Sequence, residues 1–203
     1  MILKRLPTGM LASNCYIMGN DNEGVIIDPG ANSEDILEMV RQTGLNIKYI
    51  ILTHAHVDHI VSVDEIRYKL KAEVLIHQDD GESLSNPLHN GSNLFGIKKT
   101  FDPADILLKD KDIINLEDLR LEVIHTPGHT PGGICIKAKD NLFTGDTLFR
   151  MSIGRTDLGD GDNDDLMNSI RNELMTLDDK TVVYPGHGTA TTIGYERKYN
   201  PFI

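Results

Sequence analysis

The stretch THAHVDH, residues 53–59, holds three of the eight histidines of this 203-residue chain, together with one aspartate. The apolar run YIIL directly before it, residues 49–52, predicts a buried strand. Apolar residues then recur at helical spacing and predict a helix over residues 59–70. The ligand-type side chains therefore lie where a strand ends and a helix begins, which is where α/β folds place ligand chemistry.

The spacing within THAHVDH suits two neighbouring metal ions. In an extended segment, side chains two positions apart project to the same side, so His54 and His56 can reach one ion. Asp58 and His59, at the entry to the helix, can turn toward a second position close by. Imidazole and carboxylate ligands suit zinc, and equally iron or manganese.

Three later stretches repeat the pattern of a strand followed by one ligand-type residue in a turn rich in glycine or proline. They are TPGHTPG with His129, FTGD with Asp146 and YPGHG with His187. With THAHVDH they supply seven candidate ligands, which exceeds the four that one tetrahedral ion takes. Seven ligands suit two ions that share a bridging carboxylate, as in two-metal hydrolytic sites. The sequence therefore predicts two divalent ions, zinc first, with iron or manganese as alternatives.

The other histidines are expected to be structural or solvated, among them His77, His89 and His125. His125 stands only four positions before His129, but at the end of a predicted strand rather than in the glycine turn. Packing or a backbone hydrogen bond would explain it, so only His129 is expected to hold metal.

Composition and charge narrow the class of protein. With 39% apolar residues the chain can bury one sizeable core, so a single domain over residues 1–203 is expected. The net charge of −11 and a pI near 5.1 argue against a nucleic-acid partner. The sequence has no run of 18 apolar residues and no secretory signal, which argues for a cytoplasmic protein without a membrane span. Cys15 and Cys135 are expected to be reduced and buried.

Short strands and helices are predicted to alternate along the chain. Strands are expected at residues 1–6, 15–19, 24–27, 47–52, 73–76, 119–124, 133–138, 141–143 and 182–184. Further helices are expected at residues 33–43, with Ser33 as N-cap, at 164–177 and at 191–199, while residues 78–111 are expected to be loop with a helical turn or two. Hairpin-like strand pairs in both halves favour a sandwich of two mixed sheets with helices outside.

The four motifs THAHVDH, TPGHTPG, TGD and PGHG, in this order, resemble the metallo-β-lactamase superfamily over essentially the whole chain. Within it, the stretches NCY (14–16), DPG (28–30), GDTLFRMSIGRTD (145–157) and GHGTATTIGYERKYNPF (186–202) resemble small glyoxalase II-like hydrolases. The resemblance implies an αββα sandwich with the site at one edge of the two sheets.

The resemblance also implies a role for each ligand-type residue. The first metal would be held by His54, His56 and His129, and the second by Asp58, His59 and His187, with Asp146 bridging both. Asp58 and Asp146 are the carboxylates expected to take part in catalysis. Asp28, in the DPG turn, is expected either to orient a ligand loop from outside the metal shell or to be a simple turn residue.

The activity implied by the resemblance is hydrolysis of small acyl thioesters such as S-lactoylglutathione, with a metal-bridging hydroxide as nucleophile. The sequence departs from full-length glyoxalase II, because it ends before that family's C-terminal helical region, which helps bind glutathione. Arg155 stands where that family has a substrate-binding lysine, so it is expected to bind a small anionic thioester. Alternatively, Arg155 pairs with Asp157 and braces its own loop.

Two other functions remain open at this point. The motifs, including GRTD, also resemble persulfide dioxygenases, in which a single iron held by His54, His129 and Asp146 would act on glutathione persulfide. A non-catalytic metal-binding or scaffold protein would be expected to lack a ligand, and none is missing. The hydrolase is the preferred interpretation.

Overall fold

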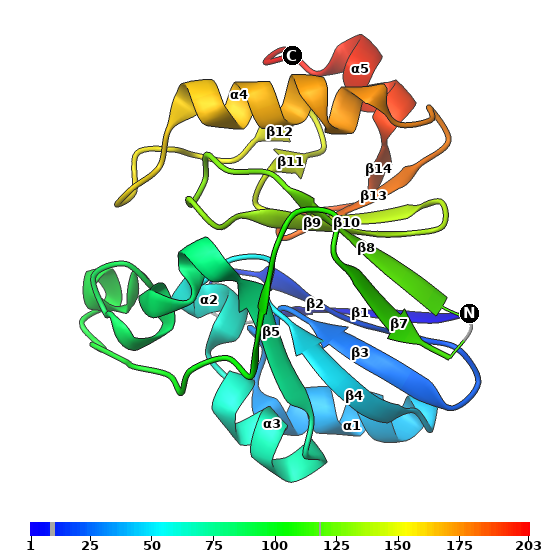
Figure 1. Cartoon of the computed structure of the whole chain (residues 1–203), viewed down its shortest axis with the longest axis vertical. Coiled ribbons are helices and arrows are strands. Elements are labelled where there is room, and N and C mark those ends of the chain that lie inside the picture. The colour runs from blue at the N-terminus through cyan, green and yellow to red at the C-terminus, as the bar shows by residue number, and fades with distance from the viewer. Residues whose placement is uncertain (9–10, 118) are drawn as a thin grey trace.

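The computed structural model describes residues 1–8, 11–117 and 119–203. It has two six-stranded sheets lying face to face with helices on their outer faces (Figure 1). The first sheet with α1 and α3 lies in the lower part of that view and α4 with most of the second sheet in the upper part, while β7 and β8 reach down beside the first sheet. The predicted architecture, two mixed sheets flanked by helices, is confirmed.

The first sheet is built mostly from the N-terminal half of the chain. In spatial order it contains β1 (Ile2–Thr8), β2 (Ser13–Gly19), β3 (Glu23–Ile27), β4 (Asn46–Ile51), β5 (Glu73–His77) and β6 (Ile106–Leu108). The first three strands pair antiparallel and the last three join in parallel. The sheet is therefore mixed, because helices cross over between the parallel strands.

The second sheet is built from the C-terminal half and is also mixed. In spatial order it contains β14 (Thr191–Thr192), β13 (Val182–Pro185), β10 (Asn141–Gly145), β9 (Ile134–Ala138), β8 (Leu119–His125) and β7 (Ile113–Leu116). Only β10 and β13 run parallel. A separate short hairpin joins β11 (Leu148–Phe149) to β12 (Ser152–Ile153).

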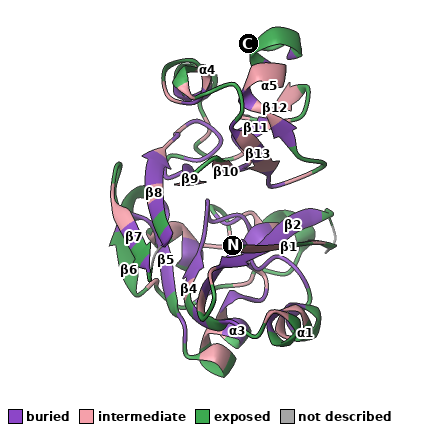
Figure 2. Cartoon of the chain, turned by 90° about the vertical axis from the view of Figure 1, so that its right-hand side faces the viewer, coloured by how far each residue is buried: buried purple, intermediate pink, exposed green. Residues whose placement is uncertain are grey.

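Three apolar layers hold the sandwich together, and Figure 2 shows buried residues along the strands of both sheets. Ile36 and Ile66 pack from helices onto the outer face of the first sheet. Ile51 and Phe143 belong to the layer between the two sheets. The third layer joins the second sheet to Leu166 and its neighbours on α4. Burying these continuous apolar faces fixes the strand ends at one edge, where the ligand loops leave.

Apart from α1, which has the predicted bounds, the predicted helices are shorter or divided in the structure. The helices are α1 (Ser33–Thr43), α2 (Val57–Ile60), α3 (Val63–Leu70), α4 (Asn163–Asn172) and α5 (Ile193–Tyr199), with 3-10 turns η1 (Gln78–Asp80), η2 (Glu82–Ser85), η3 (Ser92–Phe95) and η4 (Leu174–Thr176). None of the helices in the described ranges combines the length and the apolar character that a bilayer crossing requires.

Three helix predictions need correction. The helix over 59–70 is two helices, because the chain turns at Ser62, whose hydroxyl donates to the carbonyl of Ala31. The helix over 164–177 ends at Asn172 and continues as η4. The N-cap of α1 is Asn32 rather than Ser33, since the Asn32 side chain accepts from the amide of Glu34.

Short strands were the other features that the sequence pattern did not predict. The segment expected to be loop contains β6, which pairs with β5 at the edge of the sheet. The hairpin β11–β12 was not predicted, and the expected helix over 191–199 begins with the two residues of β14. Strands of two or three residues carry too few alternating positions for a pattern to indicate them.

Candidate metal centre

The predicted ligands gather at one edge of the two sheets, although they are far apart in the sequence. The loop after β4 brings His54, His56, Asp58 and His59, and the turns after three strands of the second sheet bring the remaining ligands. Parallel and antiparallel strands of both sheets end at this edge, so each loop starts from a rigid support. The structure thus unites all seven candidate ligands, whose metal binding remains a prediction.

The first group consists of His54, His56 and His129, whose ligand nitrogens all lie within 4.8 Å of one another. His56 Nδ1 and His129 Nε2 are 2.9 Å apart. His54 and His129 are nearly fully buried. Three imidazoles converging on one point in a buried setting are a familiar zinc-binding arrangement.

The second group consists of Asp58, His59 and His187. His59 Nε2 lies 3.2 Å from His187 Nε2 and 3.5 Å from Asp58 Oδ2, and His187 Nε2 lies 3.3 Å from the same Asp58 oxygen. With Zn–N bonds of about 2.0–2.1 Å, the edge of a ligand tetrahedron is about 3.3 Å. The three separations match that edge.

Asp146 stands between the two groups. Its Oδ2 lies 3.5 Å from His187 Nε2 and 3.7 Å from His129 Nε2, and its Oδ1 lies 3.4 Å from His59 Nε2. Gly186 lies against this carboxylate so closely that a Cβ there would come within 2.2 Å of Asp146 Oδ1. Asp146 is therefore the one carboxylate that faces both groups.

Hydrogen bonds outside the cluster fix which histidine nitrogen faces the centre. Carbonyl and carboxylate oxygens only accept, so each bound Nδ1 carries the hydrogen. His59 Nδ1 donates to Asp28 Oδ2 (3.1 Å), and His129 and His187 Nδ1 donate to the carbonyls of Arg155 (2.7 Å) and Leu11 (3.1 Å). In the neutral imidazole this leaves each Nε2 as a lone pair directed inward, as metal ligation requires.

Two buried atoms support the same interpretation. Within the described part of the chain, His54 Nε2 and Asp146 Oδ1 are buried without a hydrogen-bond partner. A buried polar atom that makes no bond costs roughly 1–3 kcal/mol, so such orphans mark a missing partner. A cation beside both atoms would satisfy them, and the donor set fits divalent metal ions.

The electrostatics of the metal-free cluster also favour cations. Burial lowers the pKa of His56 to about 3, with the nearby His129 adding to the shift, and burial holds the pKa of His54 well below its usual range. Burial opposes a charge on His59 as well, but the carboxylates of Asp146 and Asp28 raise its pKa to about 10. The carboxylates of Asp28, Asp58 and Asp146 therefore face a cluster in which two histidines stay uncharged, and a bound cation would balance them.

Asp28 orients the first ligand loop from behind. Its Oδ1 accepts from the amide of Thr53 (2.8 Å), and its Oδ2 accepts from the hydroxyl of Thr53 (2.6 Å) and from His59. The same hydroxyl lies 3.1 Å from His54 Nδ1. A hydrogen-bonded chain thus runs from His54 through Thr53 to Asp28. This geometry supports the orienting role over that of a simple turn residue.

Asp80 is a residue of the centre that the sequence did not point to. It is buried at the end of η1, in the segment expected to be loop. Its Oδ2 accepts from the amide of Ala55 (3.1 Å) and the hydroxyl of Thr130 (2.8 Å), and its Oδ1 accepts from the amide of Gly132 (2.8 Å). It therefore joins the loop of His54 and His56 to the loop of His129.

The NCY stretch ties the last ligand loop to the first sheet. Asn14 Nδ2 donates to the carbonyls of Pro185 (2.8 Å) and Gly188 (3.0 Å), on either side of His187. The Tyr16 hydroxyl donates to the same Pro185 carbonyl (2.7 Å). The sequence pointed to this stretch through the resemblance of NCY to the family, which did not indicate these hydrogen bonds.

Other predicted residues lie apart from the cluster. Arg155 makes a bidentate pair with Asp157 (2.6 and 2.9 Å), and both side chains are largely exposed. His125 stacks on His77 with ring centroids 3.9 Å apart and donates from Nε2 to the carbonyl of Pro131. His77, Asp79 and His125 form a further small group. The stacked rings present parallel edges, which converge poorly on one ion.

A cleft of about 370 Å³ opens onto the cluster. His56, Asp58, His129, Asp146 and His187 form its floor, and apolar side chains with Arg155 form its rim. This volume is within the range of small-molecule sites. The cluster of candidate ligands is therefore reachable by a small molecule.

Comparisons with known proteins agree with this geometry. The chain is 38% identical to the "Probable metallo-hydrolase YqgX" of Bacillus subtilis, over 98% of this chain and 96% of that protein. It is 34% identical to the "Hydroxyacylglutathione hydrolase GloC" of Haemophilus influenzae, over 100% and 98% of the two chains.

Solved structures show the same fold. The structure of BLEG-1 B3 metallo-beta-lactamase has a TM-score of 0.94 and 39% identity, with 99% of each chain covered. TTHA1623 in a di-iron-bound form has a TM-score of 0.87 and 33% identity, covering 98% of this chain and 100% of that one. ETHE1 from Myxococcus xanthus has a TM-score of 0.82 and 29% identity, covering 99% and 84%. The family pattern itself matches residues 8–187, and the chain therefore belongs to the metallo-beta-lactamase superfamily.

Proposed function

We propose that this protein is a dinuclear metal-dependent hydrolase of small acyl thioesters of the S-lactoylglutathione type. The observation that carries the proposal is the position of Asp146, whose two oxygens lie 3.4 to 3.7 Å from nitrogens of both ligand groups. The similarity to GloC supports the reaction class, and the similarity to a di-iron protein supports two ions. Both relatives are named as hydrolases, and the Bacillus subtilis protein is named as a probable metallo-hydrolase.

The side chains of the cluster take distinct roles in this proposal. His54, His56 and His129 hold one ion, Asp58, His59 and His187 hold the other, and Asp146 contacts both. Bound there, the ions would supply a water of lowered pKa as nucleophile and would polarise the thioester carbonyl. Asp58 lines the cleft and is available to accept a proton from that water. Asp28 and Asp80 hold the ligand loops in position by accepting hydrogen bonds from them.

The proposed substrate is anionic at its thiol end. Two divalent ions outweigh the two cluster aspartates and one hydroxide by roughly one positive charge, so the cleft can attract an anion although the chain is acidic. Arg155 lies at the rim and would add a further cation. Its bidentate pair with Asp157 competes with that role, so bracing of its own loop is the alternative.

Metal content and activity test the proposal together. We expect close to two ions per chain by elemental analysis and hydrolysis of S-lactoylglutathione that stops when a chelator removes them. Asp146→Ala should lose metal and activity, whereas Ala at the exposed Asp21 should change neither. Two bound ions without hydrolysis of any acyl thioester would contradict the proposal.

A persulfide dioxygenase is the second candidate, and the structural similarity to ETHE1 is consistent with it. That enzyme would need a single iron on His54, His129 and Asp146 and would consume oxygen. One iron per chain with oxygen uptake on glutathione persulfide would favour this function. A β-lactam substrate belongs in the same assay because of the similarity to BLEG-1.

A further inference from the structure

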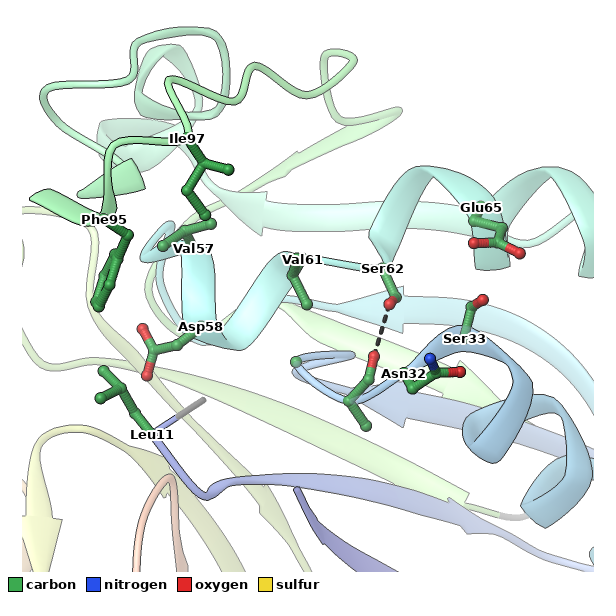
Figure 3. A pocket seen from close by; sticks show the side chains of 12 residues that line it. Leu11, Asn32, Ser33, Val57, Asp58, Val61, Ser62, Glu65, Phe95 and Ile97 are labelled. Carbon is green, nitrogen blue, oxygen red and sulfur yellow. Dashed lines mark hydrogen bonds between the residues drawn. The ribbon is translucent and has the colours of Figure 1, made fainter. Parts of the chain in front are cut away.

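A second cavity of about 320 Å³ lies beside the metal cleft (Figure 3). It extends between α2, the start of α1 and the segment after η3. Leu11, Val57, Asp58 and Phe95 line both spaces. The two cavities are therefore neighbours that share these four residues as a common wall, and the candidate ligand Asp58 belongs to that wall.

Large apolar side chains line this second cavity and are incompletely covered. Leu11 is 48%, Phe95 38% and Ile97 49% exposed. Val57, beside Phe95 and Ile97, and Val61 complete the apolar lining (Figure 3). Clustered, exposed apolar side chains around a concavity are typical of ligand-binding surfaces.

Several polar groups of the cavity are already bonded within the protein. The Asn32 side chain accepts from the amide of Glu34, and the Ser62 hydroxyl donates to the carbonyl of Ala31, as the dashed line in Figure 3 shows. Glu65 pairs with Lys69 at 2.7 Å. None of these groups requires a polar partner from a ligand.

The charges that line the cavity are all negative. Among its described lining residues, Asp58 and Glu65 are the ionisable side chains, and no Lys, Arg or His is present. Glu65 is already paired with Lys69 outside the cavity, so an anionic group would lose its hydration against an apolar wall without gaining a free cation among the lining side chains, which disfavours it. The metal cleft differs, because its rim carries Arg155. The two cavities therefore favour different halves of a thioester.

We propose that the second cavity, here named the acyl pocket and lined by Leu11, Val57, Val61, Phe95 and Ile97, binds an uncharged apolar acyl group of the substrate. The thiol carrier then occupies the metal cleft, with the thioester carbonyl at the metals beside Asp58. This inference rests on the proposed thioester hydrolysis and narrows it. It makes medium-length aliphatic acyl thioesters better substrates than the short, hydroxylated lactoyl thioester.

A chain-length series tests the acyl pocket with the metal-loaded enzyme. A fully buried methylene group is worth up to about fourfold in kcat/KM. For an open pocket we expect kcat/KM to rise at least about tenfold from S-acetyl- through S-butyryl- to S-hexanoylglutathione. The adipoyl thioester, which ends in a carboxylate, should lose most of that gain. A flat series, or an adipoyl thioester as good as the hexanoyl one, would overturn the inference.

Substitutions in the wall identify the pocket. Val61→Phe fills it and Ile97→Ser makes it polar, so both should compress the hexanoyl-to-acetyl ratio of kcat/KM to within about threefold. The matched control is Leu107→Ser, also an exposed apolar residue but on the outer strand β6 and outside both cavities. It should keep the wild-type ratio. A wild-type ratio in both wall variants would place the acyl group elsewhere.

Binding separates this inference from the proposed function. The probes are non-hydrolysable analogues of the acetyl and hexanoyl compounds, with a methylene inserted between carbonyl and sulfur, measured by calorimetry. We expect the hexanoyl analogue to bind at least about tenfold tighter, and Val61→Phe to abolish the difference. This result without any thioester hydrolysis would remove the proposed reaction but keep the pocket. Hydrolysis with equal binding of the two analogues would remove the pocket and keep the reaction.

Discussion

Single side chains decide the geometry of the metal centre, and Asp80 is the least obvious of them. It is 1% exposed and accepts three hydrogen bonds from two loops that are separated by more than 70 positions in the chain. Burial raises the pKa of Asp80, while the bonds from Thr130, Gly132 and Ala55 lower it. Both carboxylate oxygens of Asp80 must therefore act as hydrogen-bond acceptors.

Asp80→Asn should therefore weaken metal binding without removing a ligand. The amide NH₂ of asparagine must face either the Gly132 amide or the Ala55 amide, and neither backbone donor can reverse its role. We expect a loss of about 1–3 kcal/mol in the free energy of unfolding and roughly 10–100-fold in metal affinity. Chemical unfolding and metal titration measure the two effects. The control is Asp79→Asn, on the exposed neighbour, and equal metal affinity in both variants would refute the role of Asp80.

The pair His125 and His129 provides a second test at this scale. His129→Ala removes an inward Nε2 lone pair and should lose one metal ion and nearly all activity. His125→Ala removes a stacking contact with His77 and one bond to Pro131, so we expect at most about 1–2 kcal/mol of destabilisation and full metal content. Metal analysis of the two purified variants decides. Comparable metal loss would mean that the ligand loop is assigned wrongly.

The convergence of the seven candidate ligands could be predicted from the sequence because each follows a strand, three of them in a glycine or proline turn, and their metal binding stays a prediction. Such a pattern involves only neighbouring residues, so it can be recognised in the sequence alone. Asp80 could not be predicted, because its partners are backbone amides whose proximity depends on the packing of two sheets. The pairing of Arg155 with Asp157 was expected only as an alternative, since both substrate binding and bracing need the same exposed cation.

At the scale of elements, the hairpin β11–β12 forms one wall of the metal cleft. Phe149, Ser152 and Ile153 line the cleft from it. The hairpin is held by Glu196 of α5, which is fully buried and accepts from the amide of Met151 (2.8 Å). The same carboxylate also accepts from Thr191 and Asn200. The helix α5, which supplies none of the candidate ligands, thus positions the hairpin that lines the cleft.

Removing this anchor should affect substrate binding more than metal binding. Glu196→Ala leaves the Met151 amide unsatisfied, so we expect about 2–4 kcal/mol of destabilisation and a several-fold rise in KM. Metal content should stay at the wild-type level, because no ligand touches Glu196. Glu196→Gln should recover most of the loss, since its oxygen can still accept from Met151 while its NH₂ meets the Thr191 hydroxyl. Steady-state kinetics with metal analysis distinguishes the variants, and loss of metal in Glu196→Ala would contradict this assignment.

Long periodic elements were predictable and short or interrupted ones were not. The bounds of α1 were predicted correctly because Ile36 and Val40 mark a clear buried stripe and Gly44 ends the helix in a left-handed conformation. The division between α2 and α3 was missed, because apolar spacing continues across it. The hydrogen bond of Ser62 to Ala31 that makes the turn joins residues 31 positions apart.

At the scale of the whole molecule, the centre joins the two sheets. His54, His56, Asp58 and His59 extend from the first sheet, and the other three ligands extend from the second. Metal ions bound to both sets act as cross-links that the unfolded chain lacks. At a free metal concentration a thousandfold above Kd, each ion adds about 4.1 kcal/mol to the free energy of unfolding. Chelation should therefore lower the unfolding midpoint of the wild-type protein strongly.

The pH dependence of the metal-free protein follows from the same cluster. Burial lowers the pKa of His54 and His56 in the folded state, so below about pH 6.5 the unfolded chain binds protons that the folded chain does not. Stability then falls by up to about 1.4 kcal/mol per pH unit for each histidine. His59 acts oppositely: Asp146 and Asp28 outweigh its burial and raise its pKa to about 10, so its contribution is complete below about pH 6.5 and is lost as the pH rises toward that value.

The free energy of unfolding of the chelated protein should therefore peak near pH 6.5 and decline on both sides. Urea titrations between about pH 5 and pH 9 measure the curve. His56→Ala should flatten only the acidic side, because it removes one of the three histidines, with His54 and His77, whose pKa burial lowers in the folded state. His89→Ala, at an exposed histidine outside the cluster, should leave the shape unchanged. A chelated protein whose stability keeps rising from pH 6.5 to pH 9 would show that His59 is not charged between its carboxylates.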